Sequence, residues 1–486
     1  MDSGQQRAKG ADRTRLLLAG AALVLLIAVL VSGLGSSSPA PPPLPGIGRP
    51  PPSGDPFGYQ ASREAEYSSR ATAGSAHVLF AKSPGGVVAT AARVAAFRGL
   101  IDAAVRGTSI DPNVLEGIVF VESAGRPDVI AGPDPAAAAG LTQILAQTGQ
   151  ALLGMHIDLA QSRRLTAAID QAYAAGNLVM MRRLQTRRAL IDDRFNPRKA
   201  LAATVRYLQL AAGRLGGRSD LATVSYHMGI GNLQRVLSDY DGGQTVPYAQ
   251  LFFDTAPDRH AAAYQLLSGL GDDSWLYYWR VLGAEQIMQL YRGDRGALTR
   301  LSALQNANGS GSETLHPPDQ TPSFSGPDAL SSAYSARSLL PLPANAAALG
   351  LAYDPSMGSL ARRVGAPAAL YRGLRAPALD LLIELAARVR TIARMSVRAG
   401  LAAPLVVTST VTDQRYQHEL GVTDPDPSSG YSFQIARRYL SHAQAEAFQA
   451  MLDRLQALNL IAWSRSPDTI EVTVSSDADR VIVAGV

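Results

Sequence analysis

The chain of 486 residues contains no cysteine. This excludes disulfides, thiolate metal sites, a catalytic cysteine and lipid attachment through a thiol in any compartment. The chain also lacks lysine or arginine runs interleaved with aromatic residues, so no nucleic-acid partner is expected. Its net charge of +5 is modest for this length. Ordinary solubility accounts for that charge, and contact with anionic wall polymers or membrane surfaces is the alternative.

Long apolar runs are confined to the N-terminus. Residues 16–35, "LLLAGAALVLLIAVLVSGLG", carry no charge, and four cationic side chains precede them within residues 1–15. About 20 apolar residues cross a bilayer, and flanking cations keep the start of a chain cytoplasmic. We therefore expect a cytoplasmic N-terminus, a single-pass anchor in the cell membrane and an extracytoplasmic bulk. A cleaved signal peptide is the alternative.

The composition changes along the chain and predicts its domains. Apolar residues recur at three- and four-residue spacing in a first region, and β-branched strand-like runs such as "PLVVTSTVT" appear in a second. Residues 60–90, rich in alanine, serine and glycine, give no clear pattern. We expect a proline-rich linker at 36–60, a helical domain at 91–304, a second linker at 305–328 and a smaller α+β domain at 350–486.

One acidic residue stands at the end of an apolar helix face. Asp111 and Pro112 form a helix start, with a capping side chain and a proline in the first helical position. Leu115 and Val119 then recur at helical spacing, and Glu122 falls on the same face. Apolar surroundings raise the pKa of a carboxyl group, which suits a general acid near neutrality. The alternative is a terminal glutamate that faces solvent.

Several short motifs accompany Glu122 in a fixed order. They are "ESAG" at 122–125, "AAGLTQI" at 138–144, "RFNPRKALAATVRYL" at 194–208, "ATVSYHMGIGNLQRVL" at 222–237 and "YYWRVL" at 277–282. Together they resemble the catalytic domain of lytic transglycosylases of the soluble, goose-lysozyme-like class. The resemblance implies a mainly α, lysozyme-like fold and peptidoglycan glycan strands as the substrate, with no cofactor and no metal.

The resemblance also implies residue roles. Glu122 would be the single catalytic acid/base. It would protonate the glycosidic oxygen between N-acetylmuramic acid and N-acetylglucosamine, then help the C6 hydroxyl attack to give a 1,6-anhydro product. Ser123 would orient that carboxylate, and Gln143, with the backbone of Leu141 and Thr142, would line the sugar cleft. Thr142 stands where the family usually has methionine.

The later motifs supply aromatic residues and one departure. Tyr226 and Tyr277 would face the active site, near the glutamate or as sugar platforms. His227 stands where the family usually has an asparagine that binds the substrate, and a neutral histidine also donates hydrogen bonds. An arginine-rich helical segment at about 156–193 is longer than in compact members of the family. We expect it to be a solvated insertion, and the alternatives are that it binds a partner or flanks the cleft.

The C-terminal domain resembles zinc D-Ala-D-Ala carboxypeptidases over residues 405–439. Aligned on Gly430, the ligand positions hold Pro427 and Gln434, and the late strand "TIEVTV" has no histidine. Zinc needs about three protein ligands, and the nearby His418 and His442 do not restore the spacing. The resemblance implies a degenerate, metal-free domain that binds wall peptide or a protein partner. An unrelated accessory domain is the alternative.

The sequence thus predicts a membrane-anchored lytic transglycosylase. Two other functions stay open. A hydrolytic muramidase would need a second carboxylate, for which Asp134 and Asp254 are candidates. A non-catalytic peptidoglycan-binding scaffold would fit the departures at His227 and in the C-terminal domain.

Overall fold

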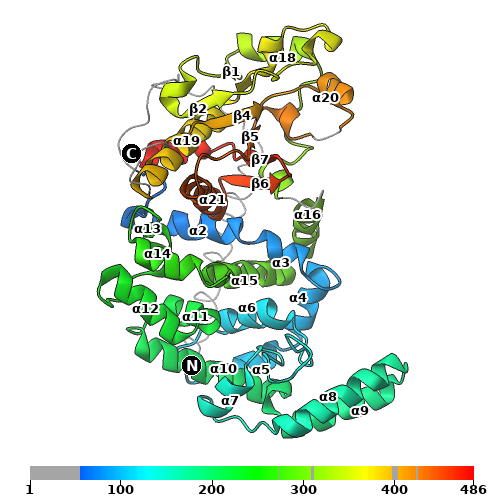
Figure 1. The fold of residues 1–486 in the computed structure, drawn as a ribbon. Helices are drawn as coiled ribbons and strands as arrows, with labels where there is room; N and C mark the ends of the chain where they lie inside the picture. The colour runs from blue at the N-terminus through cyan, green and yellow to red at the C-terminus, as the bar shows by residue number, and fades with distance from the viewer. Residues whose placement is uncertain (1–54, 272, 308–310, 397–402, 423–424, 486) are drawn as a thin grey trace, which may run out of the picture.

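The computed structural model describes residues 55–271, 273–307, 311–396, 403–422 and 425–485. It contains a mainly helical N-terminal region followed by a C-terminal region with a mixed sheet and helices (Figure 1). Within those ranges no helix has the length and apolarity needed to cross a bilayer. The predicted membrane segment at 16–35 and most of the predicted linker at 36–60 lie outside the described residues.

The N-terminal region is a succession of helices joined by short loops. Its elements are η1 (Ala61–Arg63), α2 (Glu64–Gly74), α3 (His77–Ala81), α4 (Val87–Ala95), α5 (Arg98–Val105), α6 (Pro112–Ser123), α7 (Ala146–Ala151), α8 (Leu159–Ala174), α9 (Leu178–Ile191), η2 (Asp193–Phe195), α10 (Pro197–Arg214), α11 (Ser219–Met228), α12 (Ile230–Asp241), α13 (Tyr248–Asp254), α14 (Ala261–Ser268), η3 (Ser274–Leu276), α15 (Tyr277–Gly293) and α16 (Arg295–Asn306). Helices therefore begin 30 residues before the predicted start at 91.

The C-terminal region is built on a five-stranded sheet. Its elements are α17 (Ser312–Leu315), α18 (Pro327–Ser335), β1 (Leu340–Pro341), η5 (Ala346–Leu349), β2 (Leu351–Tyr353), η6 (Ala361–Val364), η7 (Ala368–Tyr371), β3 (Gly373–Leu374), α19 (Ala376–Ser396), β4 (Leu405–Ser409), α20 (Gln414–Leu420), η8 (Pro427–Ser429), β5 (Ser432–Ala436), α21 (His442–Ala457), β6 (Ile461–Arg465), β7 (Thr469–Val474) and α22 (Ala478–Gly485). The strand order is β2-β4-β5-β7-β6. Among the described strands of this sheet, β2 and β4 pair in parallel and the other neighbouring pairs are antiparallel. Every residue of the central strand β5 except the half-buried Gln434 is buried, and Phe433 and Ile435 belong to the apolar core.

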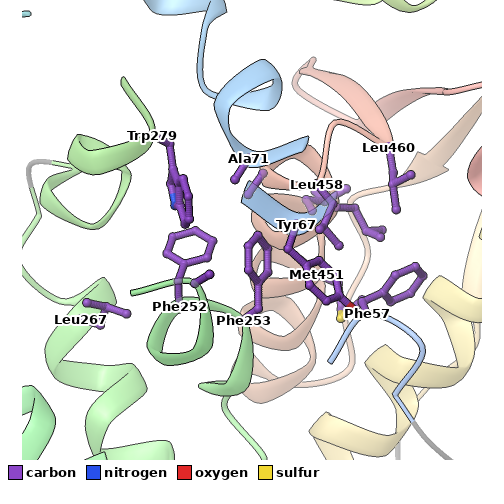
Figure 2. Packing of buried hydrophobic residues seen from close by; sticks show 14 of the residues in the cluster. Phe57, Tyr67, Ala71, Phe252, Phe253, Leu267, Trp279, Met451, Leu458 and Leu460 are labelled. Carbon is purple, nitrogen blue, oxygen red and sulfur yellow. The ribbon is translucent and has the colours of Figure 1, made fainter. Parts of the chain in front are cut away.

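The two regions share one hydrophobic core. Phe57, Tyr67 and Phe253 of the helical region pack together with residues of α21 and the turn after it, such as Met451 and Leu458 (Figure 2). The rings of Tyr67 and Phe253 stack with centroids 5.0 Å apart. Phe57 is fully buried although it belongs to the predicted proline-rich linker. The end of that linker is thus part of the folded structure.

A buried charge cluster accompanies this core. The carboxylate of Asp55 forms an ion pair with Arg259 of the helical region at 3.5 Å. It also pairs with two arginines of the C-terminal region, Arg388 at 3.6 Å and Arg454 at 3.1 Å. Burial alone would raise the pKa of Asp55, but the three guanidinium groups hold it below its usual value. A buried charge without these partners would be costly, so the cluster ties the two regions together.

The predicted linker at 305–328 differs from a free spacer. Its residue His316 is buried, stacks on Tyr431 with ring centroids 4.0 Å apart, and lies with Nε2 2.6 Å from the carbonyl oxygen of Val474. Burial lowers the pKa of His316 to about 4, so the ring is neutral near pH 7. Packing against the sheet overrides the polar, glycine- and proline-rich composition of this segment.

Gly74, the last residue of α2, tests how closely the two regions pack. A Cβ atom there would overlap the carbonyl oxygen of Gln456 and lie 2.8 Å from that of Ala457. We expect Gly74→Ala to push α2 off α21 and lower the free energy of unfolding by roughly 1–3 kcal/mol, as overpacking does. The measurement is unfolding in denaturant.

Gly99→Ala is the matched control. Gly99 is an exposed residue inside α5, and an added Cβ would meet nothing within 4 Å. The control should be neutral or gain up to about 1 kcal/mol from the loss of backbone freedom in the unfolded chain. Equal stabilities of the two variants would contradict the close approach of α2 to α21.

Candidate active site

Helix α6 positions Glu122 in its last turn. The predicted helix start is confirmed: the Asp111 side chain accepts a 2.8 Å hydrogen bond from the N–H of Asn113, and Pro112 follows the cap. The helix ends where Ala124 adopts a left-handed conformation with φ of 54°. Gly125 also has a positive φ, of 71°, and a Cβ on it would lie 2.8 Å from the nitrogen of Val94. The chain therefore turns away directly after the carboxylate.

Close packing of α6 on α15 brings the first partner to Glu122. A Cβ on Gly117 would lie 2.8 Å from the carbonyl oxygen of Val281, so the two helices approach at a glycine. The helices run antiparallel. Tyr277, which opens α15, therefore lies beside Glu122 near the end of α6, and its hydroxyl donates a 2.7 Å hydrogen bond to Oε1 of Glu122.

The environment of Glu122 favours its protonated form. Burial raises the pKa of Glu122 to about 7, and the hydrogen bond from Tyr277 acts in the lowering direction with a smaller effect. Among the described residues no charged side chain contributes to this shift. The residue nevertheless keeps partial solvent exposure. Glu122 is thus a partly exposed residue whose carboxyl group is largely surrounded by protein and exchanges its proton near neutral pH.

Aromatic rings surround Tyr277. The ring of Tyr226 lies 6.4 Å from that of Tyr277 at an interplanar angle of 21°, and the ring of His227 lies 5.1 Å away at 23°. Nδ1 of His227 is 2.7 Å from the hydroxyl oxygen of Ser274, three residues before Tyr277. Tyr226 and His227 therefore lie against the tyrosine that bonds Glu122.

Tyr226 also connects to the loop of the second motif. Its hydroxyl donates a 2.7 Å hydrogen bond to the carbonyl oxygen of Thr142, and lies 3.2 Å from the hydroxyl of Thr204. Thr142 is buried, so the position usually filled by methionine in the resembling family lies inside the protein here. The structure thus brings the second, fourth and fifth motifs together around Glu122.

Arg194 stabilises the loop that carries Leu141 and Gln143. Arg194 is buried and donates to the carbonyl oxygens of Ala137 at 2.9 Å and Ile144 at 3.3 Å. Gly140 has φ of 82°, and a Cβ on it would overlap the backbone carbonyl group of Arg194. The sequence motif contained Arg194, but spacing alone did not indicate its role beneath the loop.

Leu141 and Gln143 have different surroundings within this loop. Leu141 is fully buried in the core. Gln143 is half-buried with φ of 49°, and its Nε2 donates to the carbonyl oxygens of Gly140 at 2.9 Å and Val129 at 3.2 Å. The Gln143 amide nitrogen therefore stabilises the loop shape in this structure.

Ser123 does not have the partner that the sequence led us to expect. Its hydroxyl donates to the carbonyl oxygen of Val119 at 3.3 Å and accepts a hydrogen bond from the N–H of Arg126, also at 3.3 Å. Within the described part of the chain, no hydrogen bond joins Ser123 to Glu122. Ser123 is buried and instead closes the last turn of α6 through these two backbone partners.

The C-terminal positions that replace the expected zinc ligands lie on two different elements. Pro427 begins η8, while Gln434 lies on β5 opposite Glu471 of β7. His442 is exposed and pairs with Glu446 at 3.1 Å. Over the described ranges, no group of three or more His, Cys, Asp or Glu side chains is arranged to hold a metal ion.

Comparison with known proteins assigns no family, because no protein-family model matches the chain and no curated protein matches it. The chemistry of the Glu122 site is therefore what distinguishes the candidate functions.

The raised pKa of Glu122 predicts how the stability of the folded chain depends on pH. The carboxyl group titrates near 4.5 in the unfolded chain and near 7 in the folded one. The contribution of the protonated carboxyl to the free energy of unfolding is complete below pH 4.5. It is lost as the pH rises through about 7, because the ionised carboxylate is disfavoured in its buried position. Glu122→Gln cannot ionise. Its free energy of unfolding should match the parent's near pH 4 and exceed it by up to about 3 kcal/mol near pH 8.

Glu116→Gln on the same helix is the control, and it should change the free energy of unfolding in the opposite direction. Glu116 is fully buried and pairs with Arg98 at 3.1 Å and Arg292 at 2.7 Å. Loss of its charge leaves two guanidinium groups without their carboxylate and should destabilise the fold by roughly 3 kcal/mol at neutral pH. Denaturant unfolding across this pH range checks both variants. A Glu122→Gln protein less stable than the parent at pH 8 would refute the raised pKa.

Tyr277→Phe should raise the pKa of Glu122 further. The substitution removes the hydroxyl that stabilises the ionised carboxylate but keeps the ring that stacks on His227 and Tyr226. The measurement is a carbon-13 NMR titration of the Glu122 carboxyl, assigned by its loss in Glu122→Gln. Tyr226→Phe is the control, because the Tyr226 hydroxyl donates to Thr142 instead. An unchanged titration in Tyr277→Phe would contradict the hydrogen bond.

Proposed function

We propose that this chain is an exported peptidoglycan lytic transglycosylase that cleaves the bond between N-acetylmuramic acid and N-acetylglucosamine. The observation that carries the proposal is the state of Glu122: a partly exposed residue whose carboxyl pKa lies near 7, with one hydroxyl donor and, among the described residues, no charged group acting on it. Such a group both donates and accepts a proton at neutral pH, as one residue must in this reaction.

The proposed reaction needs one carboxyl group in two successive steps. Protonated Glu122 gives its proton to the glycosidic oxygen as the bond from C1 of the muramic sugar breaks. The resulting carboxylate then takes the proton of the C6 hydroxyl, whose oxygen forms a bond to C1. The product is the 1,6-anhydro sugar, Glu122 is protonated again, and no water is consumed. Tyr277 stabilises the carboxylate between the two steps through its 2.7 Å hydrogen bond.

The aromatic residues beside Glu122 suit a sugar-binding surface. Tyr226 and His227 pack against Tyr277 and are themselves held by Thr142 and Ser274. Aromatic rings that are fixed in this way present apolar faces and polar edges to a sugar without a large entropy cost. His227 occupies the place of the expected asparagine with its ring fixed in the site, which supports an active enzyme in spite of this departure.

Hydrolysis on the same scaffold is less well supported. A muramidase of the usual kind needs a second carboxylate that acts across the sugar. Asp134 is exposed and pairs with Arg163 at 2.9 Å, while Asp254 pairs with Arg259 at 3.0 Å. Each of the two candidate aspartates is thus engaged by an arginine in the folded chain. A single-carboxylate mechanism is therefore favoured over a paired one.

The rest of the chain completes the proposal. We propose that residues 16–35 hold the protein at the cell membrane, with the enzyme on the extracytoplasmic side. The C-terminal region, which shares its core with the helical region, would be a metal-free module that binds wall peptide or a protein partner. It would move with the catalytic site as one body, since the Asp55 cluster and the shared core join them.

Mass spectrometry of the fragments released from purified peptidoglycan tests the reaction. The full chain in detergent should release 1,6-anhydro muropeptides, and Glu122→Gln should lose this activity by at least about a thousandfold, because no other group supplies the proton. Asp134→Asn is the matched control and should retain activity. Hydrated products would establish the muramidase instead. A folded parent chain that releases nothing would favour the non-catalytic scaffold.

A further inference from the structure

Helices α8 and α9 form a hairpin that projects away from the rest of the molecule (Figure 1). The two helices pack on each other through Leu165 and Ile169 of α8, which are buried. The 16 residues of α8 extend for about 24 Å at the usual helical rise. We refer to residues 159–191 as the arm. The reaction proposed at Glu122 uses none of its side chains.

The tip of the arm exposes large apolar side chains. Tyr173 at the end of α8 and Leu178, Val179 and Met180 at the start of α9 are all exposed, and Val179 is 77% accessible. Exposed apolar groups gathered at one place usually mark a surface that becomes covered. They lie at the most remote point of the arm, where no other part of the described structure covers them.

The charge of the arm is predominantly positive, and its single aspartate, Asp170, is exposed about one turn before Tyr173. Residues 159–191 contain six arginines and one aspartate, a net charge of +5 that equals the net charge of the entire chain. No acidic residue occurs between Asp170 and Asp192. Arg182 and Arg183 are exposed one turn behind the tip, and neither has a carboxylate within ion-pair distance among the described residues. The tip is therefore apolar, and Arg182 and Arg183 lie directly behind it. We refer to these two arginines as the cationic collar.

The geometry of the tip indicates what covers it. Leu178, Val179 and Met180 are consecutive, and successive helical residues point about 100° apart. Their side chains therefore point in three directions around the axis of α9. A partner helix or a protein groove covers one stripe with residues three and four apart. A lipid interface accepts apolar side chains in all directions and attracts arginines when its headgroups are anionic.

We propose that the arm is a membrane-docking element whose tip inserts into the interface of an anionic phospholipid bilayer. Tyr173, Leu178, Val179 and Met180 enter the boundary between headgroups and acyl chains, and Arg182 and Arg183 bind the phosphates. This second membrane contact is distinct from the predicted anchor at 16–35 and does not depend on the reaction at Glu122.

Buried polar contacts connect the base of the arm to the rest of the molecule. Arg188 is buried, lies 3.6 Å over the ring of Phe195, and donates to Thr166 of α8 at 3.0 Å and to the carbonyl oxygen of Asp128 at 3.1 Å. Asp192 is also buried and accepts from Ser162 of α8 at 2.8 Å. Buried and paired charges of this kind fix one geometry. The arm is therefore held rigidly against the loop that precedes Gln143.

The absence of cysteine allows a direct test on the full chain. Val179→Cys provides a single thiol for an environment-sensitive fluorophore, and the protein is placed in nanodiscs of phosphatidylglycerol or of phosphatidylcholine. We expect blue-shifted emission, and quenching by brominated acyl chains, in the phosphatidylglycerol bilayers. Leu440→Cys is the control: Leu440 is an exposed apolar residue between β5 and α21 of the C-terminal region, outside the arm, and its label should stay in water.

Arg182→Gln with Arg183→Gln tests the cationic collar in the Val179→Cys background. The loss of two surface arginines should weaken insertion into the anionic bilayer by about thirtyfold. Glycan cleavage in detergent should not change, which separates this proposal from the one at Glu122. A Val179 label that remains in water in phosphatidylglycerol bilayers overturns the proposal. Equal insertion into both lipids, unchanged by the two substitutions, overturns the role of the arginines.

Discussion

The contact between α6 and α15 at Gly117 is the constraint on which the candidate site depends. Because a hydrogen atom replaces a side chain at this position, the α6 backbone comes close enough to the carbonyl of Val281 for the two helices to meet without a gap. The first turn of α15 then lies against the last turn of α6, and the hydroxyl of Tyr277 reaches Glu122. The same packing removes water from the carboxyl and raises its pKa. One close approach therefore sets both the partner and the proton affinity of Glu122. A wider separation would lose the hydrogen bond and return the carboxyl group to its ordinary acidity.

The sequence divides clearly into two regions, but in the folded structure these regions are not separate domains. The composition of the sequence separates helical from strand-containing segments, yet Phe57, Tyr67 and Phe253 pack into one core with α21. Asp55 adds charge pairing to that apolar contact, and it lies at the point where the described structure begins. Interfaces between independent domains are usually more polar and less tightly packed. The sheet region is therefore placed in a fixed relation to the helical region, and any ligand it binds would be held at a constant position relative to Glu122.

Local signals in the sequence predicted the local features. Asp111 and Pro112 mark the start of α6 because capping depends on neighbouring residues only, and the β-branched runs mark β4 and β7 for the same reason. The helices between residues 61 and 90 were missed, because alanine and serine give little contrast between a buried and an exposed face. The surroundings of Ser123 could not be predicted, since a hydroxyl near a helix end has several acceptors within reach and tertiary packing selects one. Arg194 shows the same limit, because its carbonyl partners belong to a loop 50 residues earlier in the chain.

Arg194 also shows how the arm and the site are mechanically joined. The guanidinium group of Arg194 pairs with buried Asp192 at 2.7 Å and donates to the loop carbonyls of Ala137 and Ile144. Asp192 in turn accepts from the first turn of α8. A continuous set of buried polar contacts thus runs from the base of the arm to the loop that holds Gln143. Such a set has few low-energy alternatives, because each break would leave a buried charge without a partner. An arm fixed to a bilayer would then hold the Gln143 loop, and with it Glu122, at a set height above the membrane. If the chain has the function proposed for it, the glycan strands it can cleave would be those that lie at that height.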